Sequence, residues 1–155
     1  MRDYAERPAT LVPPPLIYAL SFFGSWELDQ RLALRLDFGA AAQYGGWALI
    51  ALGLFGFGWS LATIWGQRTT VNPFKGATRL VTNGPFRYSR NPIYVSDWLV
   101  YAGSTLLLKS AWPLVFAPLV WLVMRYFVIA HEEAHLAAKF EDAYRGYQSR
   151  VRRWL

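Results

Sequence analysis

The segment 38–67 contains no charged side chain, and this feature constrains the fold more than any other. Within it, residues 44–65 are apolar on every face of a helix. They are long enough to cross the core of a bilayer, which needs about 20 helical residues. A helix that is apolar all round is either buried in a large protein or surrounded by lipid. Since the chain has only 155 residues, we expect an integral membrane protein.

Further apolar runs at residues 11–28, 93–108 and 111–130 predict three more membrane helices. Lys109 and Ser110 alone separate the last two runs, which predicts a tight helical hairpin. Charged residues make up 17% of the chain, against about 25% in a soluble domain. We therefore expect one all-α membrane domain over residues 1–155, with about four transmembrane helices and a C-terminal amphipathic helix.

The charges are distributed unevenly between the expected loops. The connection 66–92 has no acidic residue and holds the basic residues Arg68, Lys75, Arg79, Arg87 and Arg90. The tail after the last run is also basic, which places both segments and both termini in the cytosol, and we expect a bacterial inner membrane. The net charge of +6 flanks apolar runs rather than forming one stripe, which favours the lipid bilayer over nucleic acid as the partner.

The tail 131–155 has an apolar stripe with spacings of three and four residues. Its members are Leu136, Phe140, Tyr144, Tyr147, Val151 and Trp154. This periodicity predicts a helix that lies on the membrane surface, with basic residues on its other face. Such a helix can also cover a site beneath it.

Two polar segments at the expected cytosolic face carry the candidate chemistry. In the first, Asn83-Gly84-Pro85 predicts a turn, and Asn91-Pro92 predicts an N-cap with proline at the first helical position. The N-terminus of that helix can bind a carboxylate through its free N–H groups. The second segment is His131-Glu132-Glu133-Ala134-His135. Its carboxylates are either a solvated helix end or a pair that binds hydroxyls, an ammonium group or the arginines Arg87 and Arg90.

The run from Gly84 to Tyr94, the hairpin after it and the pattern from Glu132 to Tyr147 resemble the isoprenylcysteine carboxyl methyltransferase and phospholipid methyltransferase group of membrane enzymes. The upstream residues Thr70, Pro73, Leu80, Val81 and Thr82 fit the same pattern. The resemblance implies S-adenosylmethionine as the cofactor, and a hydrophobic or lipid-like acceptor with a carboxylate, an amine or a thiol to methylate. The cofactor contacts that it implies are Thr78, Arg79, Leu80, Val81, Phe86, Asn91, Pro92, Ile93, Tyr94 and Glu132.

The chain departs from the family pattern at three positions. Asn91 stands where eukaryotic members have His, and Glu141 stands where Gly is usual. Val128 replaces the arginine that holds the substrate carboxylate in the prenylcysteine enzymes, and the nearest arginine is Arg125.

Three residues are therefore candidates for catalysis. Arg125 is a candidate to replace the missing substrate arginine. Glu133 and Asp97 are candidates to accept a proton from an amine. Asp97 lies inside an expected span, where an acid is a functional candidate, although it can also simply pair with Arg125.

Two other functions fit parts of the pattern. His131-Glu132-Glu133-Ala134-His135 matches H-E-x-x-H, the zinc-binding helix of many metalloproteases. A catalytic zinc ion needs a third protein ligand, and the chain has only these two His and no Cys, so we expect no metal. A non-enzymatic four-span scaffold is the third possibility. A scaffold would not need the motif residues at the spacing that is typical of the family.

Overall fold

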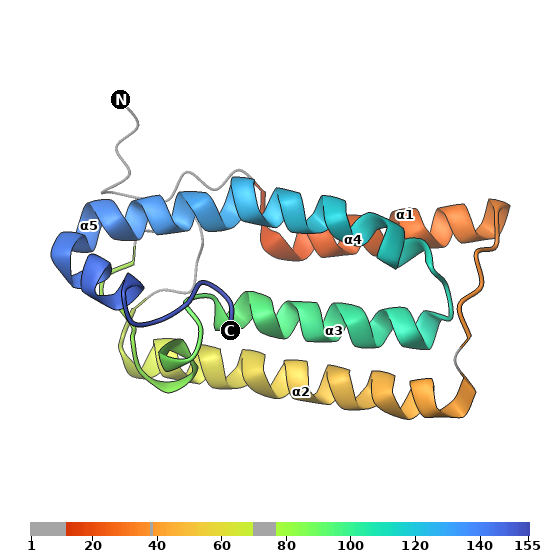
Figure 1. Ribbon diagram of the computed structural model, residues 1–155, viewed down its shortest axis with the longest axis horizontal. Coiled ribbons are helices and arrows are strands. Elements are labelled where there is room, and N and C mark those ends of the chain that lie inside the picture. Colours follow the sequence, from red (N-terminus) through yellow and green to blue (C-terminus); the bar gives the residue numbers. More distant parts are fainter. Residues whose placement is uncertain (1–11, 38, 70–76) are drawn as a thin grey trace.

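A computed structural model describes residues 12–37, 39–69 and 77–155 (Figure 1). Within these ranges the regular elements are all helical, and one isolated antiparallel bridge joins Arg35 to Ser110. Residue 11, where the first apolar run begins, lies outside the described residues, as do Thr70, Pro73 and Lys75.

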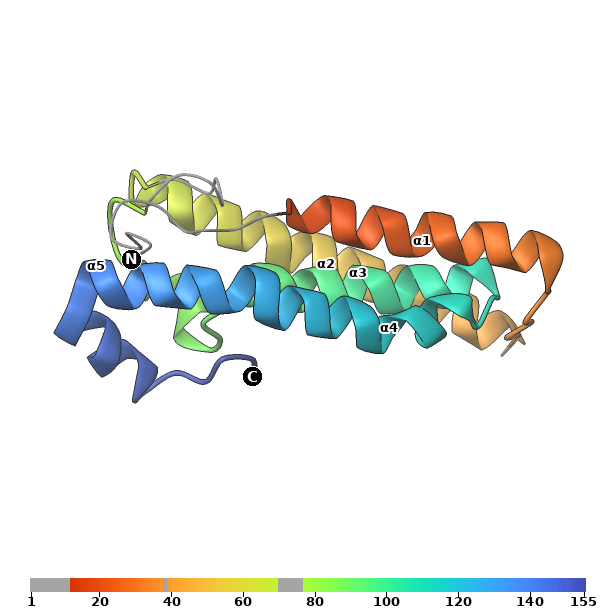
Figure 2. The same cartoon turned by 90° about the horizontal axis from the view of Figure 1, so that it is seen from above.

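Four helices run side by side along the long axis of the molecule (Figures 1 and 2). They are α1 (Pro14–Arg31), α2 (Gly39–Gly66), α3 (Pro92–Leu108) and α4 (Trp112–Val123). The last continues through a π-helical segment, η2 (Met124–Ile129), into α5 (Ala130–Gln148). By length and composition, Gly39–Gly66 and the continuous Trp112–Gln148 can cross a membrane. Four spans stay a prediction, since α1 and α3 are not among these two.

The tail differs from the single helix that was expected over 131–155. Helix α5 ends at Gln148, and at Glu141 the backbone has φ 41° and ψ −115°, which is not helical. The chain turns back at this point, so that its C-terminal end returns toward α3 (Figure 1). Positive φ favours glycine, which explains why glycine is usual at this position in the family that the sequence resembles. A short 3-10 helix, η1 (Gly84–Arg87), occupies the predicted turn.

Helices α2 and α3 pack closely through small residues. A Cβ atom added to Gly103 would lie 2.5 Å from the carbonyl oxygen of Gly46, and one added to Gly53 would lie 2.7 Å from that of Ser96. Small residues that let backbones approach are typical of helix contacts within membranes. Because this contact occupies the Ser96 and Gly103 side of α3, the opposite side is left for other neighbours.

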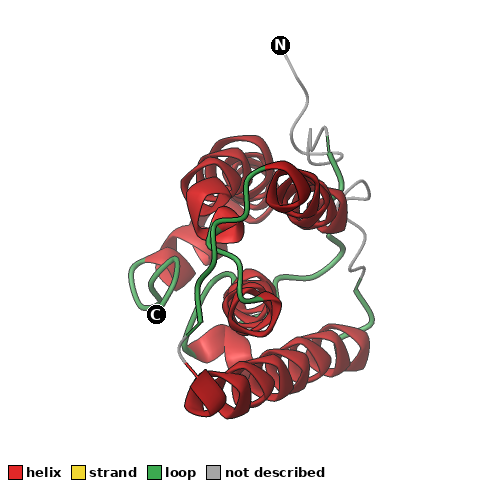
Figure 3. Cartoon of the chain, turned by 90° about the vertical axis from the view of Figure 1, so that its right-hand side faces the viewer, coloured by secondary structure: helices red, strands yellow, loops and turns green. Residues whose placement is uncertain are grey.

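Helix α1 packs against α4, and α3 lies between this pair and α2 (Figure 3). Tyr101 ties α3 to the pair, because its hydroxyl donates a hydrogen bond to the Pro113 carbonyl at 2.7 Å. The same hydroxyl lies 2.7 Å from the Ser21 hydroxyl of α1. Two helix pairs, α2–α3 and α1–α4, thus face each other across the bundle.

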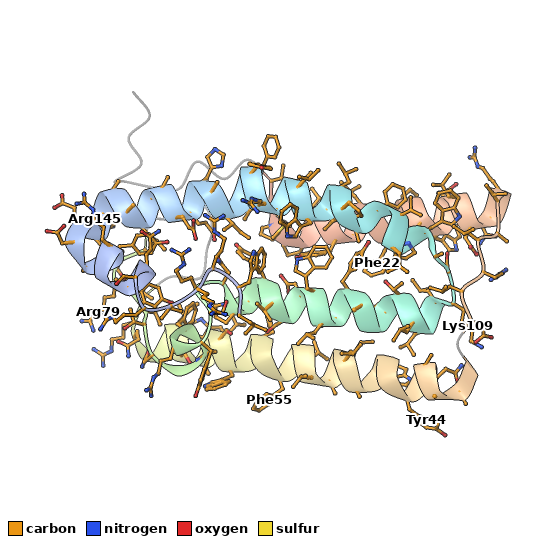
Figure 4. All side chains as sticks on the ribbon, viewed as in Figure 1. Phe22, Tyr44, Phe55, Arg79, Lys109 and Arg145 are labelled. Atoms are coloured by element: carbon orange, nitrogen blue, oxygen red, sulfur yellow. The ribbon has the colours of Figure 1, made fainter. Side chains whose placement is uncertain are left out.

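The outer surface is apolar along the middle of the bundle and polar at its ends (Figure 4). Large apolar side chains such as Tyr44 and Phe55 are 78% and 68% exposed and point away from the bundle (Figure 4). Soluble proteins rarely expose apolar surface on this scale, whereas lipid solvates it. The surface therefore supports a membrane location.

The two ends of the bundle differ in charge. At the hairpin end, the basic residues are paired with acids, as in Lys109–Asp37 at 3.0 Å and Arg35–Asp29 at 3.6 Å. The opposite end holds the loop 77–92 and α5, with Arg79 and Arg145 among its basic residues (Figure 4). The two polar segments of the sequence thus meet at one end, as their predicted topology requires.

Candidate functional site

A cavity of about 970 Å³ is lined by α1, α2, α3, α5 and the loop that precedes α3. Small-molecule sites commonly measure roughly 300–1,000 Å³. Its polar half is formed by the loop 77–92, the first turns of α3 and helix α5, and its apolar half by α1, α2 and the following turns of α3. Leu54 of α2 lines the cavity and is 59% exposed.

Nearly all the residues singled out from the sequence line this one cavity. They are Arg79, Leu80, Val81, Phe86, Asn91, Pro92, Ile93, Tyr94, Asp97, Glu132 and Glu133. These residues come from three separate segments, the loop, α3 and α5. No single stretch of the sequence therefore contains the whole site. The structure thus brings together most of the site that the sequence implied.

Two of the candidates, Thr78 and Arg125, do not line the cavity. Thr78 bonds through its backbone N–H to the hydroxyl of Thr69 at 3.0 Å, and Thr69 is the residue that reaches the cavity wall. The Arg125 guanidinium lies 4.9 Å from the centre of the Trp121 ring, a cation–π contact. Within the described residues Arg125 forms no ion pair with Asp97, so the pairing considered above is not seen.

Glu132 presents a carboxylate to the polar half of the cavity. The hydroxyl of Tyr94 donates a hydrogen bond to its Oε1 at 2.7 Å, and no basic side chain of the described residues pairs with it. Glu132 lies beyond the expected span 111–130. Burial raises the pKa of its carboxyl to about 7, although the Tyr94 hydrogen bond acts in the opposite direction. This group is therefore both positioned and close to changing charge at neutral pH.

Glu133 has a different environment from its neighbour. Its carboxylate accepts hydrogen bonds from the Arg153 guanidinium, with Nε at 3.1 Å, and lies 3.3 Å from Nη2 of Arg90. The side chains of Glu133 and Arg90 are each only 12% exposed. The pairing with Arg90 is one that the sequence suggested, and Arg153 adds a second cation. Glu133 is thus held in a charge cluster with Arg90 and Arg153.

Asn91 occupies the predicted N-cap position and Pro92 the first helical position, but the side chain of Asn91 does not cap α3. Its Nδ2 instead donates to the carbonyl oxygen of Arg153 at 2.9 Å. The backbone N–H of Arg90 bonds in the same way to the carbonyl of Arg152 at 2.9 Å. The prediction that the Asn91 side chain caps α3 is therefore wrong. The side-chain amide of Asn91 instead joins the C-terminal segment to the start of α3.

His135 also lines the cavity, although the sequence indicated it only as a possible zinc ligand. It is only 2% exposed, lines the cavity and accepts a hydrogen bond at Nε2 from the Ala77 N–H at 3.1 Å. It therefore fastens the loop onto α5. Its spacing of three residues from Glu132 was the signal that the two share a face of the helix.

The geometry offers little to the zinc hypothesis. In the ranges that the structure describes, no three His, Cys, Asp or Glu side chains are grouped as metal ligands. Nε2 of His135, one of the two expected ligands, already accepts the Ala77 hydrogen bond, and His131 is not among the residues that line the cavity.

Comparison with known protein families distinguishes between the remaining hypotheses about function. The phospholipid methyltransferase family matches residues 41–143, which run from α2 into α5 and contain most of the cavity wall. The chain belongs to the phospholipid methyltransferase family. Membership in this family indicates membrane methyltransferase activity.

A further comparison found a relative of the chain. An uncharacterized protein of Haemophilus influenzae is 45% identical over 63 residues, which are 41% of this chain and 100% of that protein. No solved structure matches the chain. The family match therefore rests on sequence, while the cavity shows how this phospholipid methyltransferase family member arranges its residues.

Proposed function

We propose that the protein binds S-adenosylmethionine in the polar half of the cavity and transfers its methyl group to a hydrophobic or lipid-like acceptor at the cytosolic membrane face. The observation that carries this proposal is the meeting of the family-type residues from the loop, α3 and α5 on one cavity wall. The cavity continues into an apolar half lined by α1 and α2, which suits an acceptor dissolved in the bilayer.

The polar half has donors and acceptors that fit the cofactor. Nε of Arg90 is buried and has no hydrogen-bond partner among the described residues, which makes it suitable for a carboxylate. The Glu132 carboxylate is suitable for ribose hydroxyls or an ammonium group. Leu80, Val81 and Phe86 supply apolar surface for a flat base.

When bound, S-adenosylmethionine supplies a methyl group on a sulfonium, which is already an activated leaving group. The protein then has mainly to align the acceptor and to exclude water. Holding two reactants in line can lower a barrier by roughly 7–11 kcal/mol. His135 and Tyr147 contribute by fastening the loop over the site, through bonds to Ala77 at 3.1 Å and to the Phe86 carbonyl at 2.7 Å.

The acceptor enters, in this proposal, between α1 and α2. Phe22 of α1 and Leu54, Phe57 and Leu61 of α2 line the apolar half of the cavity. Burying a hydrocarbon chain against such a wall contributes about 0.8 kcal/mol per methylene group. We expect methylated products that partition into organic solvent rather than water.

The proposed orientation can be tested with single cysteines, because the chain has none. Thr82 and Arg150 are exposed at the cavity end, and Ala33 is exposed at the hairpin end. Cysteines at Thr82 and Arg150 are expected to react with an impermeant maleimide only in inverted vesicles, and one at Ala33 only in intact cells, because the loop charges select this topology. Labelling of Thr82 and Arg150 from opposite sides would contradict it.

Binding of the cofactor tests the proposed chemistry directly. Titration of the purified protein with S-adenosylmethionine in a calorimeter is expected to give saturable binding near one molecule per chain. His131→Ala is expected to keep this binding, since His131 does not line the cavity. Absence of binding by the parent, together with stoichiometric zinc that His131→Ala loses, would instead support the metalloprotease.

A further inference from the structure

A hollow of about 440 Å³, which we call the α4 groove, lies between α3, α4 and the C-terminal segment. Its lining residues are Trp98, Leu114, Ala117, Pro118, Trp121 and Trp154. Within the part of the chain that the structure describes, none of them also lines the larger cavity. Large apolar side chains of α4 are exposed around the groove, as are those of Leu119 and Leu122. The α4 groove is therefore a feature of the apolar outer surface, and the proposed methyl transfer does not use it.

A cation lies beside the α4 groove. The guanidinium of Arg125 is 4.9 Å from the centre of the Trp121 ring, which lines the groove, and 5.6 Å from that of Tyr126. No carboxylate among the described residues pairs with Arg125. A cation in an apolar helix is costly unless it pairs with an anion or reaches the membrane surface. Arg125 therefore has its full capacity left for an anionic ligand at this place.

The dimensions of the α4 groove match one leaflet of a bilayer. Trp98, Trp121 and Trp154 lie on its wall, and tryptophan side chains favour headgroup depth, which places this part of the groove near a membrane interface. From Arg125 to Leu114 the helix extends over about 16 Å. The hydrocarbon core of one leaflet is about 15 Å thick, half that of a bilayer. The groove thus offers an apolar wall of acyl-chain length with a cation at one end.

We propose that the α4 groove binds an anionic phospholipid that is not a methyl acceptor. One acyl chain lies along residues 114–121, and the phosphate binds the guanidinium of Arg125. Guanidinium and phosphate groups match in charge and can form two parallel hydrogen bonds. A zwitterionic phospholipid carries its own ammonium group, which competes with Arg125 for the phosphate. The proposal depends on the membrane location of the protein and not on methyl transfer.

A second copy of the chain fits the α4 groove less well than a lipid. The segment 112–129 contains no acidic residue. A twofold interface brings the same surface of both copies together, so each copy would bring its Arg125 to that interface. The two cations would then share an apolar contact without a carboxylate from this helix. The charge of Arg125 therefore favours an anion from the bilayer over self-association.

The C-terminal segment connects the α4 groove to the larger cavity. Trp154 lines the groove, and the preceding residue, Arg153, pairs with Glu133 and accepts a hydrogen bond from Asn91 at its carbonyl. Glu133 and Asn91 both line the cavity. A lipid packed against Trp154 favours this fastened arrangement, so the lipid and S-adenosylmethionine are expected to increase each other's affinity. This link, unlike the lipid site itself, rests on the proposed function.

Native mass spectrometry tests the lipid site with two defined lipids. Dioleoylphosphatidylglycerol and dioleoylphosphatidylcholine have the same acyl chains and one phosphate each, and they differ in net charge. Each is titrated into delipidated protein in detergent micelles, and the fraction of chains that retain one lipid is measured. The parent is expected to bind phosphatidylglycerol about tenfold more tightly, as for one charge-assisted hydrogen bond. Arg125→Gln is expected to lose this preference.

Three further variants distinguish the α4 groove from general surface charge. Arg125→Lys keeps the charge and is expected to retain part of the preference. Arg145→Gln removes a cation whose side chain is 76% exposed, and it is expected to bind both lipids as the parent does. Ala117→Phe fills the groove while keeping Arg125, and it is expected to weaken binding of phosphatidylglycerol severalfold. The melting temperature of each variant without lipid shows whether it is folded.

Three results would contradict the lipid site. The first is a folded Arg125→Gln protein that keeps the parental preference for phosphatidylglycerol. The second is an equal loss of preference in Arg145→Gln, which would indicate diffuse surface charge. The third is displacement of phosphatidylglycerol from the parent by an equal concentration of oleic acid, which would assign the groove to a free fatty acid.

The link to the cavity is measured by calorimetric titration with S-adenosylmethionine, with and without phosphatidylglycerol in the micelles. The affinity of the parent for S-adenosylmethionine is expected to rise severalfold with the lipid, and that of Arg125→Gln to stay unchanged. No effect of the lipid on the parent would remove the link and leave the lipid site intact. No binding of S-adenosylmethionine by the parent in either condition would instead refute the proposed function.

Discussion

Glu132→Gln is expected to weaken binding of S-adenosylmethionine by about 10–100-fold at pH 8, because a charge-assisted hydrogen bond contributes about 1.5–3 kcal/mol. The substitution keeps the shape of the side chain and its contact with Tyr94, and it removes only the charge. Glu132 is the carboxylate in the polar half without a basic partner among the described residues. The measurement is a calorimetric titration of both proteins with the cofactor.

The pH dependence of the affinity for S-adenosylmethionine distinguishes a direct role of Glu132 in binding from a structural role. Since the pKa of Glu132 is raised to about 7, its carboxyl is charged at pH 8 and largely neutral at pH 6. The affinity of the parent is therefore expected to fall as the pH is lowered from 8 to 6, whereas that of Glu132→Gln stays flat. Asp142→Asn is the matched control on the same helix. A Glu132→Gln affinity within threefold of the parent at pH 8 would remove Glu132 from the site.

Glu133→Ala is expected to lower the stability of the folded protein by about 3 kcal/mol. It leaves Arg90 and Arg153 without their shared carboxylate, and breaking a buried ion pair costs about 3–5 kcal/mol. We take the lower end because the Arg153 side chain is 33% exposed. For a chain of this size the loss corresponds to a fall in melting temperature of roughly 6–12 °C. The melting temperature in detergent, followed by near-ultraviolet circular dichroism, measures it.

Two further variants test which ion pair accounts for the loss of stability. Arg153→Ala retains the Arg90–Glu133 pair and is expected to lose less stability than Glu133→Ala. Asp142→Asn breaks only an exposed pair with Arg145, which contributes about 0–1 kcal/mol, so its melting temperature is expected to change little. A Glu133→Ala protein that melts with the parent would show that the cluster does not stabilise the fold.

Much of the fold could be predicted because it depends on local patterns. The apolar run 44–65, the Asn91-Pro92 start of α3 and the Lys109-Ser110 hairpin each lie within one short segment, and the structure places helices and turns at all of them. The tail was harder. An apolar stripe with helical spacing does not reveal that Glu141 adopts a positive φ, so the reversal of the chain and the end of α5 at Gln148 were missed.

The candidate site likewise has a part that could be predicted from the sequence and a part that could not. The resemblance to a family located the residues of the loop, α3 and Glu132, because these occupy short motifs. It did not reveal that Asn91 binds the Arg153 carbonyl, or that Arg153 joins Glu133. These contacts join residues separated in sequence by 62 and 20 positions. Only the folded chain brings such partners together, and their side-chain types are common enough to give no signal alone.

The direction in which Glu132 points depends on helix register set by the π-helical segment Met124–Ile129. Within it the N–H of Ala130 bonds to the carbonyl of Arg125, five residues back. Each such turn takes up one residue more than an α-helical turn, so the residues after it are rotated by about 100° relative to an unbroken α-helix. In an unbroken helix His131 would take the direction that Glu132 has. The π-helical segment therefore shifts the helix register by one residue. As a result, the face of α5 that lines the cavity does not continue the face that the α4 register alone would give.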